Sequence, residues 1–200
     1  MEIAIPDNIK HLYADKKHPI VKIPNPILRL PCKPIEIFDE NLNNFINDMI
    51  YWSYHGPGIG IAAPQLGRSE RIILVDPEYG KPEIYINPEI IHQEEHMEIE
   101  EGCLSIPGVF GLVKRSRIVT IKALNREGNP VNKTYNGLGA VVVQHELDHL
   151  DGILFIDKAI PGTLYARDPD EMESKRKTRE TELRNKNLGF ISNPDEEISS

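Results

Sequence analysis

The chain has 200 residues, of which 40% are hydrophobic and 27% are charged, so it can form a buried core and is not a wholly disordered chain. Its 23 Lys and Arg residues against 31 Asp and Glu residues give a formal net charge of −8. Because DNA-binding proteins carry a basic patch or stripe, this balance argues against a DNA partner. The two cysteines, Cys32 and Cys103, are too few for a multi-bridge disulfide scaffold.

The sequence carries no sign of a membrane segment or of an export signal. No apolar run approaches the ~18 residues that a membrane-spanning helix needs. The first residues, Met1–Asp7, lack both a positively charged stretch and a continuous apolar stretch. We therefore expect a cytoplasmic protein without a membrane partner.

The first clear helix is expected at about residues 40–54. Asp39 can cap its start, and Gly56 followed by Pro57 would end it. Apolar residues recur within it at the spacing of one helix face. This face consists of Leu42, Phe45, Ile46, Met49 and Ile50.

Short strands and a second helix follow. The expected strands are 71–75, 83–87, 95–101, 118–124 and 131–135, with a hairpin turn at 126–129. The second helix is expected at about 137–150, where Gly152 can end it in a left-handed conformation. Strands in close succession, flanked by two helices, predict an α+β fold of mainly antiparallel sheets packed around the second helix, with the first as an N-terminal helix.

The composition changes once, near Pro161. Beyond this point the chain is dense in alternating charges, and its final residues are polar. We expect residues 1–160 to form one folded domain and residues 161–200 to form a charged, partly helical C-terminal tail.

The second helix carries the segment His145-Glu-Leu-Asp-His149. Histidines at positions i and i+4 lie one turn apart on the same helix face, so both rings can bind a single cation. Glu146 is rotated away from His145 by about 100°. Its carboxylate can therefore approach a metal-bound water without being a ligand, take a proton from it and pass the proton to a leaving amine.

Such a site needs a third protein ligand and an open position. A third histidine six residues after the second is excluded, because position 155 is Phe. Glu171 or Glu173 downstream is one alternative, although both lie among many charges. The alternative that we favour is Cys103 in the segment Glu101-Gly-Cys-Leu-Ser105, since a thiolate is a strong ligand and Gly102 lets the backbone pass close to a cation.

A third segment, Gly58-Ile-Gly-Ile-Ala-Ala-Pro-Gln65, is typical of a backbone that runs alongside a ligand. It is not a dinucleotide-binding fingerprint, because no third glycine opens a helix at the required position. Gln65 has a side-chain amide that can donate a hydrogen bond to a developing oxyanion.

Together, Gly58–Gln65, Glu101–Ser105 and Gln144–Leu150 resemble the three signature motifs of the peptide deformylase family, in the same order and spacing. The resemblance extends over most of residues 20–160. Ile61 differs, because the family usually has Leu there. The resemblance implies an enzyme that removes the formyl group from N-formylmethionyl nascent polypeptides, with such peptides as substrates and the ribosome as a further partner.

The resemblance also implies roles for individual residues. Cys103, His145 and His149 would bind the metal, and a water bound to that metal would attack the formyl carbon, with Glu146 as general acid and base. The Gln65 side chain and the backbone N–H of Leu104 would stabilise the oxyanion. The family commonly uses one Fe²⁺ per chain, with Ni²⁺, Co²⁺ or Zn²⁺ as substitutes, whereas the ligand set alone favours zinc.

For the substrate, the expected binding residues come from two segments. The backbone of Gly58, Ile59 and Gly60 would exclude acyl groups larger than formyl. Leu138, Val141 and Val142 share a helix face with His145 and would form an apolar pocket for the methionine side chain.

Two other functions fit the metal motif alone. One is a metallopeptidase that cleaves internal peptide bonds and uses Glu171 or Glu173 as third ligand. The other is a non-catalytic domain with a structural metal, which needs four protein ligands and leaves Glu146 and Gln65 without a purpose. Arg115 is expected to support the site, either by holding a substrate carbonyl or by pairing with Glu101.

Overall fold

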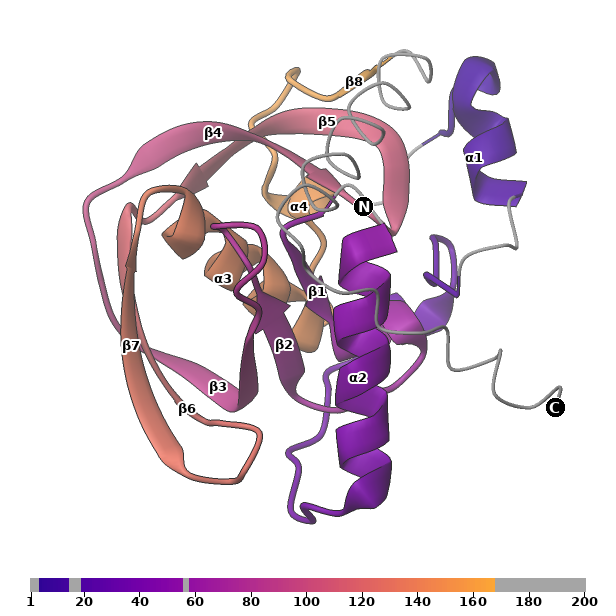
Figure 1. Ribbon diagram of the computed structural model, residues 1–200. Helices are drawn as coiled ribbons and strands as arrows, with labels where there is room; N and C mark the ends of the chain where they lie inside the picture. The colour runs from indigo at the N-terminus through magenta and orange to yellow at the C-terminus, as the bar shows by residue number, and fades with distance from the viewer. Residues whose placement is uncertain (1–3, 15–18, 56–57, 168–200) are drawn as a thin grey trace, which may run out of the picture.

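A computed structural model describes residues 4–14, 19–55 and 58–167 of the chain (Figure 1). It confirms the α+β class, because all its strand pairs are antiparallel and its two long helices lie at the two predicted positions. The helices are η1 (Asp7–Ile9), α1 (Lys10–Ala14), η2 (Pro26–Arg29), α2 (Glu40–His55), η3 (Ala63–Leu66), α3 (Leu138–Leu150) and α4 (Phe155–Lys158). The strands are β1 (Gly60–Ala62), β2 (Ile72–Val75), β3 (Glu83–Glu94), β4 (Met97–Cys103), β5 (Ile106–Arg115), β6 (Ile118–Leu124), β7 (Pro130–Asn136) and β8 (Tyr165–Ala166).

Five strands form one sheet in the order β1-β2-β3-β6-β7. Successive side chains of a strand point to opposite faces, and β2 divides its side chains accordingly. Ile73 and Val75 pack in the same apolar cluster as Val142 and Leu147 of α3. Ile72 and Leu74 pack with residues of α2, including Met49. The two helices therefore cover opposite faces of this sheet.

The remaining strands form a smaller sheet in the order β4-β5-β8. A third apolar cluster lies against it and includes Ile106 and Val113 of β5 together with Phe155 of α4. Ile9 from the N-terminal segment is fully buried in the same cluster. Figure 1 shows β4 and β5 curving around α3, so that this helix lies in the middle of the molecule.

The sequence explains why α3 can occupy this central position. Apolar residues lie on several sides of it, and nearly the whole helix from Gly139 to Leu150 is buried. A helix that is covered on all sides presents its polar residues to other protein groups rather than to water. The buried polar side chains of α3 therefore need polar partners inside the protein.

The structure corrects the element boundaries in the middle of the chain. β3 runs seven residues beyond its predicted end, and β4 begins two residues later than predicted. β1 and β5 were not predicted as strands, and α1 and α4 were not predicted as helices. The predicted strand at 118–124 and both long helices are confirmed.

Part of the predicted C-terminal tail is described, namely residues 161–167, and it contains strand β8. Residues 168–200, including Glu171 and Glu173, lie outside the described residues, so the division at residue 160 stays a prediction. Within the described ranges, no helix combines the length and the hydropathy that a membrane crossing requires.

Candidate metal centre

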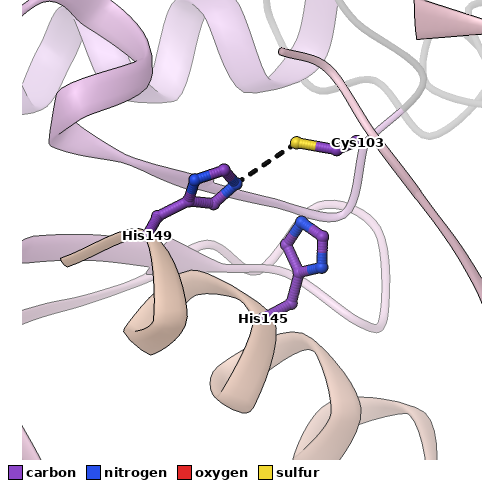
Figure 2. A group of neighbouring side chains, drawn as sticks. All are labelled: Cys103, His145 and His149. Carbon is purple, nitrogen blue, oxygen red and sulfur yellow. Dashed lines mark hydrogen bonds between the residues drawn. The ribbon is translucent and has the colours of Figure 1, made fainter. Parts of the chain in front are cut away.

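Cys103, His145 and His149 lie together in the interior. One possible ligand atom from each residue can be chosen so that all lie within 4.8 Å of one another. The Sγ atom of Cys103 is 3.2 Å from Nε2 of His149, and the ring of His145 lies beside this pair (Figure 2). Metal–ligand bonds of about 2.0–2.3 Å let one cation contact atoms at such separations. The donor set of one sulfur and two ring nitrogens suits a divalent transition metal.

Local structure brings these three side chains together. His145 and His149 are one turn apart on α3, and their ring centroids are 5.1 Å apart. Cys103 ends β4, where Leu104 and Ser105 form the turn into β5. The pairing of β4 and β5 is shifted between Gly102 and Cys103, and this irregularity lies beside the histidines.

A buried ionic network supports the ring of His145. Its Nδ1–H donates to Oε2 of Glu101 over 2.8 Å, which leaves Nε2 free to bind a cation. Arg115 donates to both carboxylate oxygens of Glu101, at 2.6 and 2.9 Å. Burial would raise the pKa of Glu101, but its hydrogen bonds to Arg115 and His145 lower the pKa to about 2. Glu101 is therefore a carboxylate, which fixes the proton of His145 on Nδ1.

Arg115 also connects this network to a second acidic residue, Asp148 of α3. It donates to Asp148 over 2.6 Å, and Lys158 of α4 donates to the other oxygen of Asp148 over 2.6 Å. The Arg115 side chain is only 2% exposed. The pairing of Arg115 with Glu101, one of the two predicted alternatives, is therefore the one observed.

Glu146 is buried in the interior, next to His145 in the sequence of α3. Among the residues that the structure describes, its buried Oε2 atom has no hydrogen-bond partner, and the same holds for Nδ1 of His149. Burial raises the pKa of Glu146 to about 7. A buried carboxylate oxygen without a partner indicates a place for a water or a polar ligand atom.

Gln65 lies beside Cys103, and its amide is held in one orientation. Its Oε1 accepts from the backbone N–H of Ala62 over 2.8 Å. Its Nε2 faces Cys103 Sγ at 3.6 Å and Ser105 Oγ at 3.4 Å. The amide N–H groups are thus directed toward the cluster.

The glycine-rich segment passes close to the side chain of Glu146 on α3. A Cβ atom on Gly60 would lie 2.6 Å from Glu146 Oε1 and 2.6 Å from Val142 Cγ1. A Cβ atom on Gly58 would lie 3.2 Å from Leu104 Cδ1, closer than ordinary van der Waals contact. The structure therefore brings Gly60 and Val142 to Glu146, and it brings Gly58 to Leu104, the residue after Cys103.

The other predicted substrate-binding residues, Ile59, Val141 and Leu138, differ in how deeply they are buried. Ile59 packs against the same apolar cluster as Val142. Val141 is buried, whereas Leu138, the first residue of α3, is 47% exposed. Leu138 thus lies at the surface end of the helix.

Comparison with known proteins identifies the family. The family model described as polypeptide deformylase matches residues 17–163. A peptide deformylase of Acetivibrio thermocellus is 44% identical over 163 residues, which are 82% of this chain and 93% of that protein. The chain belongs to the peptide deformylase family. Members of this family are hydrolases that remove the N-terminal formyl group during protein biosynthesis.

Solved peptide deformylases share the fold. The structure from Thermotoga maritima matches with a TM-score of 0.69 and 43% identity over 71% of this chain and 97% of that chain. The structure from Legionella pneumophila matches with a TM-score of 0.68 and 38% identity over 86% of this chain and 98% of that chain. The family implies a catalytic metal, and Cys103, His145 and His149 fit one within the described part of the molecule.

Membership of the deformylase family argues against the predicted alternative of a metallopeptidase that cleaves internal peptide bonds. That alternative relied on Glu171 or Glu173 as third ligand, and Cys103 supplies a third potential ligand atom instead.

Sequence reasoning missed several supporting residues. Gln144 binds the backbone of Ser116 through its side chain, with distances of 3.0 Å to the N–H and 2.8 Å to the carbonyl. Ser105 contacts Gln65, and Lys158 pairs with Asp148. Gln144 and Asp148 lie on α3 at helical spacing from the two histidines. This spacing could have indicated that Gln144 supports the site and that Asp148 needs a partner such as Lys158. Ser105 carries no comparable signal.

Proposed function

We propose that this chain hydrolyses N-formylmethionyl peptides to formate and a peptide with a free amino terminus. The observation that carries the proposal is the convergence of three metal-binding side chains, an unpartnered buried carboxylate and an oriented amide in one interior site. Family membership supports the reaction class. The substrate chemistry demands these parts, since amide hydrolysis requires an activated water, a proton donor for the amine and a group that stabilises the oxyanion.

Cys103, His145 and His149 would hold one Fe²⁺, with Zn²⁺, Ni²⁺ or Co²⁺ as substitutes. When bound, the cation lowers the pKa of a bound water to about 7 and polarises a carbonyl oxygen. The choice of iron rests on the resemblance to the family. The burial of His149, the low exposure of His145 (11%) and its hydrogen bond to Glu101 favour tight binding of any such ion.

Glu146 would move the proton of the reaction. A general acid and base works best with a pKa near the working pH, and burial raises the pKa of Glu146 to about 7. Its unpartnered Oε2 can accept a proton from the attacking water. The same atom then donates this proton to the departing α-amine.

Gln65 and the backbone N–H of Leu104 would stabilise the oxyanion. Gln65 is suited to this task because the Ala62 N–H fixes its carbonyl oxygen, so its N–H₂ group needs no reorientation during the reaction. Leu104 directly follows Cys103, and a donor there is adjacent to the cluster.

For the substrate, we propose that Gly58, Ile59 and Gly60 bound the formyl group and that Leu138, Val141 and Val142 receive the methionine side chain. The close approach of Gly60 to Glu146 and Val142 leaves no room for a side chain there. A rigid backbone at this place would exclude an acetyl group sterically, beyond the ~10–200-fold that one methylene supplies by packing alone. Nascent chains leaving the ribosome in the cytoplasm would supply the substrate.

The deciding experiment combines metal analysis with a deformylation assay. Protein purified without oxygen is analysed for metal and offered formyl-Met-Ala, acetyl-Met-Ala and an unblocked casein. We expect one ion per chain, release of formate from the first peptide and no cleavage of the other two. Cleavage of casein with no formate release would contradict the proposal.

A further inference from the structure

The residue before Cys103 is held by an aromatic ring. Gly102 lies opposite Phe110 in the pairing of β4 with β5. A Cβ atom on Gly102 would lie 2.5 Å from Cε1 of Phe110, so the ring rests directly on the glycine backbone. The position of the ring and the path of the chain into Cys103 therefore depend on each other.

A cation lies on the same ring. The guanidinium carbon of Arg167 is 4.1 Å from the centroid of Phe110. Strand β8 brings it there, because Tyr165 pairs with Phe110, and the backbone N–H of Arg167 donates to the carbonyl of Gly108 over 2.9 Å. A guanidinium over an aromatic ring is attracted by the negative face of the ring.

Arg167 also reaches the strand that ends at Cys103. Its guanidinium and the hydroxyl of Tyr165 both donate to the carboxylate of Glu100 on β4. The Arg167 side chain is 17% exposed and that of Glu100 is 41% exposed, so this ion pair lies at the surface of the β4–β5 hairpin. One side chain thus binds β4 through Glu100 and β5 through Phe110, just before the sulfur ligand.

We propose that Arg167 is a positioning residue for the metal ligand Cys103. It presses Phe110 onto Gly102 and thereby holds the sulfur toward His149. The proposal rests on the proposed metal site and adds to it a residue that lies beyond residue 163, where the match to the family model ends.

The physical basis is the freedom of the hairpin end. Cys103 is the one ligand of the three that is not on α3, and it follows a glycine at a point where the strand pairing is irregular. Glycine has more backbone freedom than any other residue. Fixing this backbone before the ion arrives reduces the ordering cost of binding and slows the loss of the ligand.

The test measures metal release in the full chain. Protein loaded with Co²⁺ is mixed with excess EDTA, and the absorption band of the cobalt–thiolate bond is followed with time. For Arg167→Gln we expect release about tenfold faster than in the wild type, the low end of the effect of residues that orient ligands. Arg167→Lys keeps the charge but loses the planar guanidinium that stacks on the ring. Its rate of cobalt release should therefore lie between the rates of the wild type and of Arg167→Gln.

A matched control is available in Arg68. This residue also lies over a ring, 4.8 Å from the centroid of Phe45, and also pairs with a carboxylate, that of Glu70. Arg68→Gln removes the same kinds of contact without touching the β4–β5 hairpin. We expect it to release cobalt at the wild-type rate.

A double variant tests the route through the ring. If Arg167 acts through Phe110, then Arg167→Gln added to Phe110→Leu should accelerate release no further than Phe110→Leu alone. A wild-type release rate in Arg167→Gln, an equal acceleration in Arg68→Gln, or full additivity with Phe110→Leu would each overturn the proposal.

These readouts are independent of substrate. If wild-type protein binds cobalt but releases no formate, the proposed function fails while the role of Arg167 can still be measured. If formate release is observed and cobalt release is unchanged in Arg167→Gln, only the positioning role fails.

Discussion

Two neighbouring residues, Gly60 and Glu146, have different roles in the proposed reaction. Glu146 carries a titratable group that burial shifts toward neutral pH, and Gly60 contributes only the absence of a side chain. Sequence patterns predict the first readily, because a Glu next to a metal-binding histidine has a known use. They do not by themselves predict that Gly60 lies against Glu146, since a glycine in a loop more often marks a turn.

Replacing Glu146 by Gln tests the proton-transfer role. The amide keeps the volume and cannot take up a proton, so we expect kcat to fall by about 10²–10⁴-fold. Metal content should stay at the wild-type level, because Glu146 is not among the three clustered ligands. Steady-state formate release and metal analysis measure both quantities. Glu127→Gln, in the exposed turn after β6, serves as the control, and near-normal turnover in Glu146→Gln would remove this residue from the mechanism.

Replacing Gly60 by Ala tests the close approach over Glu146. The new Cβ would lie 2.6 Å from both Glu146 Oε1 and Val142 Cγ1, so the carboxylate or β1 must move. We expect kcat/KM to drop by about 10²-fold, the effect of a displacement of about 1 Å in an active site. The double variant Gly60→Ala with Val142→Ala removes one of the two clashes and should recover part of the activity. Unchanged kinetics in Gly60→Ala would show that the backbone at Gly60 can move away from Glu146, and would contradict this prediction.

At the scale of elements, the strength of a local pattern decides what can be predicted. The helices α2 and α3 have long apolar patterns and were found at nearly the right bounds. β5 contains Pro107, Gly108 and Gly111, which suggest turns, although its pairing with β4 overrides them. β3 changes register twice in its pairing with β6, so its alternation breaks where the strand continues.

The short helix α4 is held to the N-terminal part of the domain by Asp157. Its carboxylate pairs with Arg29 and accepts from the N–H of Leu154 over 2.9 Å. Partial burial raises the pKa of Asp157, but hydrogen bonds and the charge of Arg29 lower it to about 2, from the usual 3.8. The pair therefore stabilises the fold at pH values above about 4, and this contribution is lost as the pH falls toward 2.

Urea unfolding of Asp157→Asn checks this dependence. We expect the variant to unfold at lower urea than the wild type at pH 7, and the difference to shrink progressively below pH 4. Asp151→Asn removes the partner of Arg71 at a carboxylate that is 54% exposed and should change the midpoint little at any pH. A difference for Asp157→Asn that is constant with pH would contradict the assignment.

At the scale of the whole molecule, the three potential ligands come from two parts of the fold. Cys103 belongs to the smaller sheet, and the histidines belong to the helix that packs on the larger one. The three residues could be chosen from sequence because two share one helix and the third completes a known motif. Their network of Glu101, Arg115, Asp148 and Lys158 could be predicted only in part, since it depends on how β5 and α4 meet α3.

Removing the metal should lower the thermal stability of the whole chain. An ion that binds only the folded state at 100 times its Kd stabilises it by about 2.7 kcal/mol. For a chain of 200 residues this corresponds to a shift in Tm of about 5–10 °C. Calorimetry of the metal-free and reloaded protein measures the shift, and Cys103→Ser should reduce it. An equal Tm with and without metal would show that the three residues do not share an ion.

The enclosure of α3 determines the order in which the protein folds and binds its metal. Neither histidine can meet the sulfur until the hairpin of β4 and β5 has closed over the helix, so the complete ligand set exists only after tertiary structure has formed. Newly made chains should therefore fold first and bind the metal ion afterwards. During that interval the sulfur is unprotected, and it is then that an oxidant would do the most damage.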